Sequence, residues 1–131
     1  MRGVNRLIIV GRVGRDPELR HGRTGTAWCS LSVATDRSVR QEHGWSTLTD
    51  WHRVKAFGRT AELCHERLSR GSLVAVEGPL TYETWRDDSG NSRTAAVVLA
   101  DRVEFISSPA ARPEAAPAVP GASDAVAPSA G

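Results

Sequence analysis

The chain has 131 residues, of which 40% are hydrophobic and 24% charged, and its formal net charge is +2. This composition is typical of one globular domain and argues against a large multi-step enzyme. The two cysteines, Cys29 and Cys64, are too few for a disulfide-stapled secreted scaffold, and they form no C-x-x-C pair for zinc. We therefore expect a protein of the reducing cytoplasm that uses no metal or other cofactor.

The apolar run near the N-terminus, residues 7–10, lies between two arginines. It is far shorter than a signal-peptide core or the roughly 20 residues that cross a membrane, so we expect no membrane partner. Charge is spread unevenly, because residues 1–106 carry all but one of the 17 basic residues and all but two of the 15 acidic ones. The basic character therefore belongs to the N-terminal part.

Residues 107–131 differ in composition from the rest of the chain. They are mostly Ala, Pro and Ser, include most of the seven prolines and show no apolar periodicity. Such a segment buries too little apolar area to offset the entropy lost on ordering. We predict a folded domain over residues 1–106 and a disordered tail over residues 107–131.

Runs of β-branched and apolar residues, separated by Gly, Pro and polar stretches, predict five strands in the domain. The strands are expected over residues 4–13, 27–35, 49–57, 72–80 with an extension through 85, and 93–106. The polar stretch 36–44 is interpreted as a loop. These boundaries place a glycine or a turn-forming residue after almost every strand.

One helix is predicted over residues 61–69, with Thr60 as its N-cap. Ala61, Cys64 and Leu68 then share one face, which we expect to be buried. Five strands with one helix between the third and the fourth are the order of the five-stranded Greek-key OB barrel. The predicted fold class is therefore all-β, a five-stranded OB-fold barrel with one short helix and a disordered C-terminal tail.

The third predicted strand has two dissimilar faces, because side chains alternate across a strand. One face carries Trp51, Arg53, Lys55 and Phe57, and the other carries His52, Val54 and Ala56. Exposed rings beside cations suit a single-stranded nucleic acid, because bases stack on the rings while the cations meet phosphates. The alternative is that the rings flank the edge of the core and the cations are only solvated. The opposite face suits a core or a subunit contact.

The other tryptophans are further candidates for the same surface. Trp28 points away from the core on the second predicted strand, where it adds a stacking platform or covers the edge of the barrel. Trp45 falls in the polar loop and Trp85 in the hairpin after the fourth strand, with Arg86 and Arg93 nearby. These loop residues are interpreted either as clamps over a nucleic-acid strand or as local anchors.

Short motifs follow one another through most of the chain. They are residues 1–11, residues 14–20, Ser32-Val-Ala-Thr35, Asp50-Trp-His-Arg-Val54, Phe57-Gly-Arg59, Ala61-Glu-Leu63, Gly71-Ser72, Val76-Glu-Gly78, and Trp85 with Ser89-Gly90. In this order, over about residues 3–106, they resemble the bacterial single-stranded DNA-binding proteins.

The resemblance implies an OB fold and a homotetramer that binds and protects single-stranded DNA irrespective of base sequence. It implies a role in replication, recombination, repair or chromosome maintenance and a location at the nucleoid in the cytoplasm. It also implies that Trp51, Phe57 and Trp85 stack on bases and that His52 lies at a subunit interface.

The sequence departs from the family at three places. Val39 stands where another stacking Trp is often found, and residues 81–84 read Thr-Tyr-Glu-Thr where the family hairpin is usually basic. The sequence ends Ala127-Pro-Ser-Ala-Gly131, without the acidic and apolar tip that recruits partner enzymes in the family. The chain resembles a short-tailed paralogue, for which we expect no recruitment of partner enzymes through the tail.

Two other classes of function are alternatives. An enzyme is disfavoured because no P-loop, G-x-G-x-x-G or H-E-x-x-H motif occurs, and Asp87 with Asp88 forms a turn more readily than a nuclease metal site. An OB module that binds RNA or protein is the other alternative, since fold does not fix the ligand. The preference for DNA over RNA rests on the resemblance. The sequence does not decide whether a disulfide joins two copies of Cys29, or two copies of Cys64, in an assembly of several chains.

Overall fold

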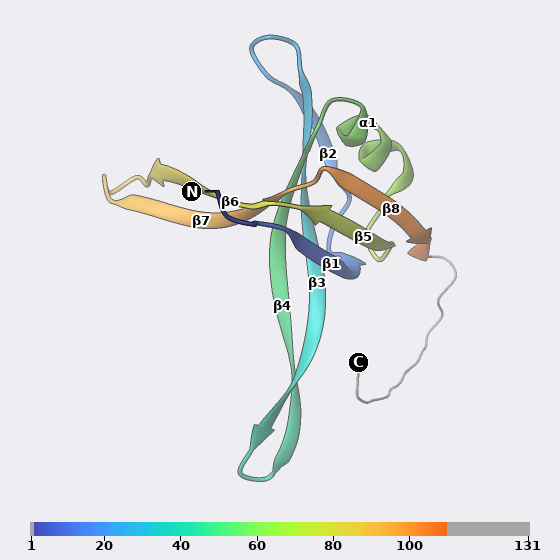
Figure 1. The fold of residues 1–131 in the computed structure, drawn as a ribbon, viewed down its shortest axis with the longest axis vertical. Helices are drawn as coiled ribbons and strands as arrows, with labels where there is room; N and C mark the ends of the chain where they lie inside the picture. Colours follow the sequence, from blue (N-terminus) through green and yellow to red (C-terminus); the bar gives the residue numbers. More distant parts are fainter. Residues whose placement is uncertain (1, 110–131) are drawn as a thin grey trace.

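The structure is a computed structural model that describes residues 2–109. Figure 1 shows strands that cross near the middle of the molecule, with a single helix at one side. The elements are β1 (Leu7–Val13), β2 (Glu18–His21), β3 (Ala27–Gln41), β4 (Gly44–Phe57), α1 (Gly58–Arg67), β5 (Leu73–Gly78), β6 (Leu80–Arg86), β7 (Ser92–Leu99) and β8 (Arg102–Ser107). The prediction of an all-β fold with one short helix is confirmed.

The strands form one sheet in the order β6-β7-β4-β3-β1-β5-β8, and β2 pairs with β3 beside this path. Every pair is antiparallel except β4 with β7. Among the described residues the two ends of the sheet, β6 and β8, do not pair with each other. The prediction of a five-stranded barrel is therefore wrong in two respects, because the strands number eight and the barrel is not closed.

Two predicted strands are each divided in the structure, and one strand was not expected. Pro79 has no N–H to donate and separates β5 from β6. Residues 100–101 separate β7 from β8, because the chain there passes from β4 to β5. The Ala100 N–H donates to the Lys55 carbonyl of β4 at 2.8 Å, and the Asp101 N–H donates to the Glu77 carbonyl of β5 at 2.9 Å. The additional strand is β2, which pairs with the first residues of β3 where a loop was expected.

A long two-stranded ribbon replaces the predicted polar loop over residues 36–44. β3 and β4 pair along their whole length, down to Gln41 opposite Gly44, and the ribbon extends well beyond the rest of the sheet (Figure 1). Polar cross-strand contacts hold it, for example Arg37 Nε donating to the Asp50 carboxylate at 2.7 Å. Polar pairs of this kind stabilise a hairpin. They do not produce the alternation of apolar and polar residues from which a strand is predicted.

The helix begins earlier than predicted and without a side-chain cap. Phe57 is the N-cap residue in an extended conformation, Gly58 turns the chain with a φ of +61°, and Thr60 therefore does not cap the helix. The Leu68 N–H donates to the Cys64 carbonyl at the C-terminal end. Burial of Ala61, Cys64 and Leu68 confirms the predicted apolar face.

The core lies between the inner face of the sheet and α1. It consists of small and medium apolar side chains, namely Ile9, Val13, Ala27, Cys29, Leu31, Val33, Val54, Ala56, Ala61, Cys64, Leu68, Val74, Val76 and Val98. Both cysteines are free and fully buried within it. No helix among the described residues is long and apolar enough to cross a membrane.

The last described strand includes the first residue of the predicted tail. Ser107 is still part of β8 and pairs with Leu73 of β5. The predicted disordered tail, residues 107–131, otherwise lies almost entirely outside the described residues.

Candidate nucleic-acid interface

β4 alternates between a solvent face and the core over residues 51–57. Val54 and Ala56 are fully buried, while Trp51 and Phe57 are 60% and 48% exposed and Arg53 is exposed between them. Both rings are therefore about half or more open to solvent. Burying two alternate residues in the core forces the rings and cations of this strand outward.

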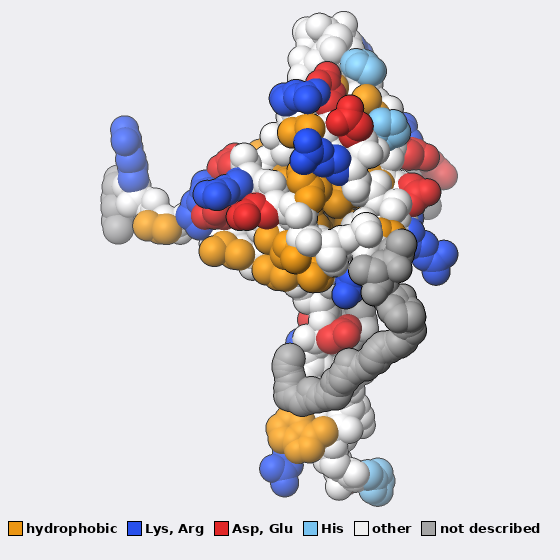
Figure 2. Space-filling model, turned by 90° about the vertical axis from the view of Figure 1, so that its right-hand side faces the viewer, with side chains coloured by type: hydrophobic (Ala, Val, Ile, Leu, Met, Phe, Trp, Pro, Cys, Tyr) orange, Lys and Arg blue, Asp and Glu red, His pale blue; other side chains and the backbone are white. Residues whose placement is uncertain are grey.

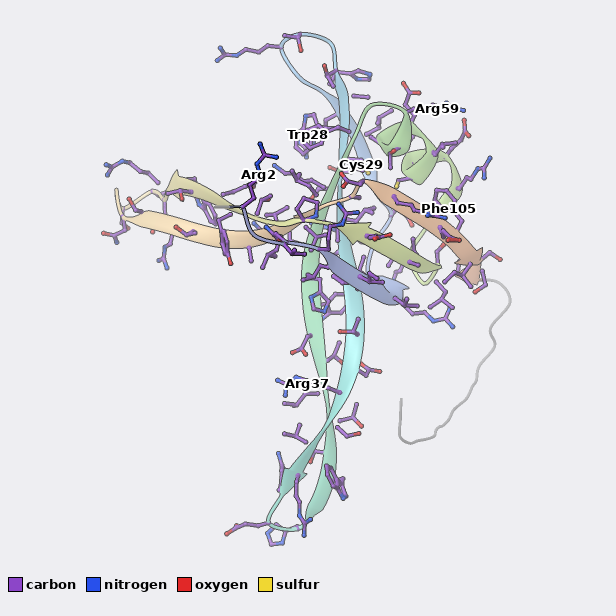
Figure 3. The ribbon with its side chains drawn as sticks, in the orientation of Figure 1. Arg2, Trp28, Cys29, Arg37, Arg59 and Phe105 are labelled. Atoms are coloured by element: carbon purple, nitrogen blue, oxygen red, sulfur yellow. The ribbon has the colours of Figure 1, made fainter. Side chains whose placement is uncertain are left out.

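β3 completes this surface with mostly small side chains. Register places Ser32 opposite Arg53, Ser30 opposite Lys55 and Trp28 opposite Phe57. Figure 3 shows Trp28 and Cys29 on opposite sides of β3, with Cys29 toward α1. We call this surface the aromatic-cation face and define it by Trp28, Ser30 and Ser32 of β3 with Trp51, Arg53, Lys55 and Phe57 of β4.

Gly14, just beyond the end of β1, lies against the six-membered ring of Trp51. Its N–H donates to the Ser32 carbonyl at 2.8 Å, which fixes this backbone against β3. A Cβ at this position would overlap the outer ring carbons of Trp51. The sequence indicated only a turn residue at Gly14, because a contact with a ring 37 positions away leaves no sequence signal.

Trp28 has two cations close to its ring. The guanidinium carbon of Arg20 is 5.8 Å from the centre of its ring and Lys55 Nζ is 4.9 Å from it. Both are cation–π distances. Arg20 was missed from the sequence, because it reaches Trp28 through the unexpected pairing of β2 with β3.

Lys55 is engaged within the protein as well. Its Nζ lies 2.6 Å from a carboxylate oxygen of Glu83 on β6, and the lysine side chain is only 22% exposed. The two residues face a cleft of about 400 Å³, which lies where the aromatic-cation face meets residues 15–20 and Glu83 of β6. The cleft is lined by Arg15, Asp16, Glu18, Arg20, Trp28, Ser30, Arg53, Lys55 and Glu83.

Trp85 on β6 reaches the same surface. The Arg53 guanidinium lies 6.0 Å from the centre of its ring, and the Trp85 side chain is 44% exposed. The structure therefore brings together Trp28, Arg53, Lys55 and Trp85, from two strands of the ribbon and one strand of the neighbouring hairpin.

The side chains of Arg86 and Arg93 form hydrogen bonds with the turn between β6 and β7. Arg86 donates to the Gly90 carbonyl at 2.9 Å, and Arg93 Nε donates to the Asp87 carboxylate at 2.8 Å. The Arg93 hydrogen bond and backbone N–H groups, Asn91 foremost, lower the pKa of Asp87. Asp87 thus organises a turn, and the described residues hold no cluster of His, Cys, Asp and Glu suited to a metal ion.

Trp45 lies away from the aromatic-cation face. It is 68% exposed near the outer end of the ribbon, where the Arg40 guanidinium of β3 is 5.9 Å from its ring. It lies six positions, about 20 Å along a strand, beyond Trp51, which is itself the member of the aromatic-cation face on β4 nearest to the outer end of the ribbon. The structure does not bring this tryptophan together with the other candidates.

His52 is on the side of β4 opposite the aromatic-cation face. Its Nε2 lies 2.8 Å from the Thr35 hydroxyl, and the ring is half-buried. A separate apolar surface lies on β1, where Ile8 is 71% and Val10 53% exposed. Figure 2 shows hydrophobic side chains gathered in the middle of one side of the molecule, beside basic and acidic ones.

Solved structures share this fold. A single-strand binding protein of Plasmodium falciparum, determined in complex with single-stranded DNA, superposes with a TM-score of 0.74 at 22% identity, covering 81% of this chain and 97% of the other. A deletion mutant of the single-stranded DNA binding protein from Thermus aquaticus gives a TM-score of 0.69 at 29% identity, covering 80% of this chain and 51% of the other.

A family model agrees with this likeness. The model of the single-strand binding protein family matches residues 4–106, which is most of the chain and nearly all of its described part. The chain therefore belongs to the single-strand binding protein family.

Proposed function

We propose that this protein binds single-stranded DNA across the aromatic-cation face, irrespective of base sequence. The observation that carries the proposal is the pair of exposed rings, Trp51 and Phe57, on one strand with the exposed cation Arg53 between them. Membership of the single-strand binding protein family supports it.

Stacking supplies the contact with the bases. Each base that stacks on an aromatic side chain contributes roughly 1–3 kcal/mol, and every base offers a π-face. Trp51 and Phe57 are about 20 Å apart along β4, which leaves room for a few nucleotides between them. Trp85 extends the same surface from the neighbouring hairpin.

Cations supply the contact with the backbone. Arg53 presents a planar guanidinium that can pair with phosphate oxygens while it lies against Trp85. No side chain of this surface needs to read a base edge, so binding does not depend on sequence. Trp45, Arg86 and Arg93 are too far from the surface or too engaged elsewhere to define it, and we propose them as outer contacts only.

The experiment that tests this function is a titration of the tryptophan fluorescence with oligo-dT and with the matching oligo-U, at several salt concentrations. We expect quenching that saturates with oligo-dT and weakens as salt rises. No quenching with either strand contradicts the proposal, and tighter binding of oligo-U shows an RNA-binding protein instead.

We propose a binding protein and not an enzyme. The pairing of Asp87 with Arg93 and with backbone N–H groups supports a structural role for the one turn that resembled a metal site. Incubation of labelled single strands with the protein and magnesium should leave the strands intact. Steady shortening of the strands under these conditions contradicts this part of the proposal.

We also propose that the protein is a homotetramer, supported by the exposed apolar side chains Ile8 and Val10 on β1 and by the half-buried His52. Sedimentation at micromolar concentration should report four subunits, and a monomer contradicts it. The proposed cellular setting is replication, recombination or repair at the nucleoid in the cytoplasm.

A further inference from the structure

We propose that the cleft beside Trp28 is a phosphate subsite for the bound strand, and that the carboxylate of Glu83 occupies it while no strand is bound. This inference rests on the proposed function, and it adds a competitor built into the binding surface. Lys55 is the cation for which the carboxylate and a phosphodiester of the strand compete.

The geometry around Lys55 defines the phosphate position. Lys55 Nζ has the Glu83 carboxylate at 2.6 Å on one side and the ring of Trp28 at 4.9 Å on another. An ammonium group donates equally well to a carboxylate and to a phosphate oxygen, since both are charged acceptors. A phosphate in place of the carboxylate would therefore lie inside the cleft, close to the ring of Trp28.

The charges of the cleft nearly cancel. Four basic side chains line it, Arg15, Arg20, Arg53 and Lys55, together with three acidic ones, Asp16, Glu18 and Glu83. Two of the cations form ion pairs with these acids. A guanidinium nitrogen of Arg20 lies 2.8 Å from a carboxylate oxygen of Glu18, and Lys55 Nζ lies 2.6 Å from one of Glu83. A strand gains the full attraction of Lys55 only when the carboxylate of Glu83 moves away.

Glu83 is placed so that it can move. It lies on β6, which is at one end of the sheet, and its side chain is 38% exposed. Its ion pair with Lys55 is thus partly solvated, and such pairs contribute little to folding. Exchange of the carboxylate for a phosphate leaves the fold intact but reduces the net gain from binding at Lys55.

The test is the substitution Glu83→Gln, measured with a labelled oligo-dT by fluorescence anisotropy at several salt concentrations. Glu104→Gln on β8 is the matched control, since it removes the same charge from an exposed carboxylate outside the cleft. We expect Glu83→Gln to tighten binding by about two- to fivefold, the scale of one exposed ion pair. We also expect its salt slope to steepen by about 0.7, one additional phosphate contact on a single strand.

A second variant assigns the effect to Lys55. In a Lys55→Gln background the gain from Glu83→Gln should disappear, because no ammonium is left to release. A gain that persists without Lys55, or that Glu104→Gln reproduces, overturns the subsite. If the unmodified protein binds no oligo-dT, the proposed function itself fails, whereas binding that Glu83→Gln leaves unchanged overturns the subsite alone.

Discussion

The six-membered ring of Trp51 lies so close to Gly14, just beyond the end of β1, that an added Cβ at Gly14 would overlap its outer carbons. The contact joins residues that are 37 positions apart in the chain. It holds the outer carbons of the ring against the end of β1, while 60% of the surface of Trp51 stays exposed to solvent. A glycine is required here because of the close approach of the ring and not because of an unusual backbone conformation.

Gly14→Ala is expected to weaken DNA binding without unfolding the protein. The added methyl group displaces the Trp51 ring, which is exposed and able to move, so the free energy of unfolding should change little. The decrease in affinity for oligo-dT should be smaller than the roughly 1–3 kcal/mol expected when one base no longer stacks at all. Fluorescence anisotropy and urea denaturation measure the two quantities.

Gly22→Ala is the control for this substitution. An added Cβ at Gly22 would lie 3.8 Å from the Thr26 carbonyl oxygen, which is ordinary contact distance. It should therefore leave the affinity unchanged. Equal affinities for the Gly14→Ala and Gly22→Ala proteins would show that the contact of Gly14 with Trp51 does not matter for binding.

Arg53→Gln is expected to reduce the dependence of binding on salt. Removal of one ion pair with a phosphate should lower the slope of the logarithm of affinity against that of salt by about 0.7. Lys55→Gln should lower the slope less, because the charge of Lys55 is already offset by Glu83. Arg102→Gln on β8, a cation that is 71% exposed and outside the cleft, should leave the slope unchanged. A slope that Arg53→Gln does not alter removes Arg53 from the binding surface.

The buried thiol of Cys64 should make folding less favourable in alkali. Burial, with a smaller contribution from Cys29, raises the pKa of Cys64 from 9.0 to about 12. Above pH 9 the unfolded chain loses this proton while the folded chain keeps it, so the free energy of unfolding falls between pH 9 and pH 12. Below pH 9 both states are protonated and the stabilising contribution is complete.

Denaturation of the wild type and of Cys64→Ala across this pH range isolates the effect. The substitution leaves a small cavity that lowers stability at every pH, but it should flatten the decline in alkali. Parallel curves for the two proteins would show that the thiol ionises equally in the folded and unfolded states.

Alternation within single strands was the part of the architecture that could be predicted from the sequence. The period of two in residues 51–57 correctly placed Val54 and Ala56 in the core and left the rings of Trp51 and Phe57 outside. The helical spacing of the apolar residues in α1 predicted its buried face equally well. In both cases a local repeat reports directly on burial.

Contacts between distant segments could not be predicted in this way. The outer half of the ribbon is held by polar pairs such as Arg37 with Asp50, which carry no hydrophobic period. The ion pair of Lys55 with Glu83 joins residues 28 positions apart, and only the folded hairpin brings them together. The sequence therefore predicted only a phosphate contact or solvation for Lys55 and did not indicate its pairing with Glu83.

The most direct test of the account is the affinity of labelled oligo-dT for the Trp51→Ala and Phe57→Ala proteins, measured by fluorescence anisotropy. Tyr82→Ala is the matched control, because Tyr82 is a 67% exposed aromatic residue of β6 outside the aromatic-cation face. The account predicts that each of the first two substitutions weakens binding by about 1–3 kcal/mol and that the control does not weaken it. Unchanged affinity in both the Trp51→Ala and Phe57→Ala proteins would contradict it.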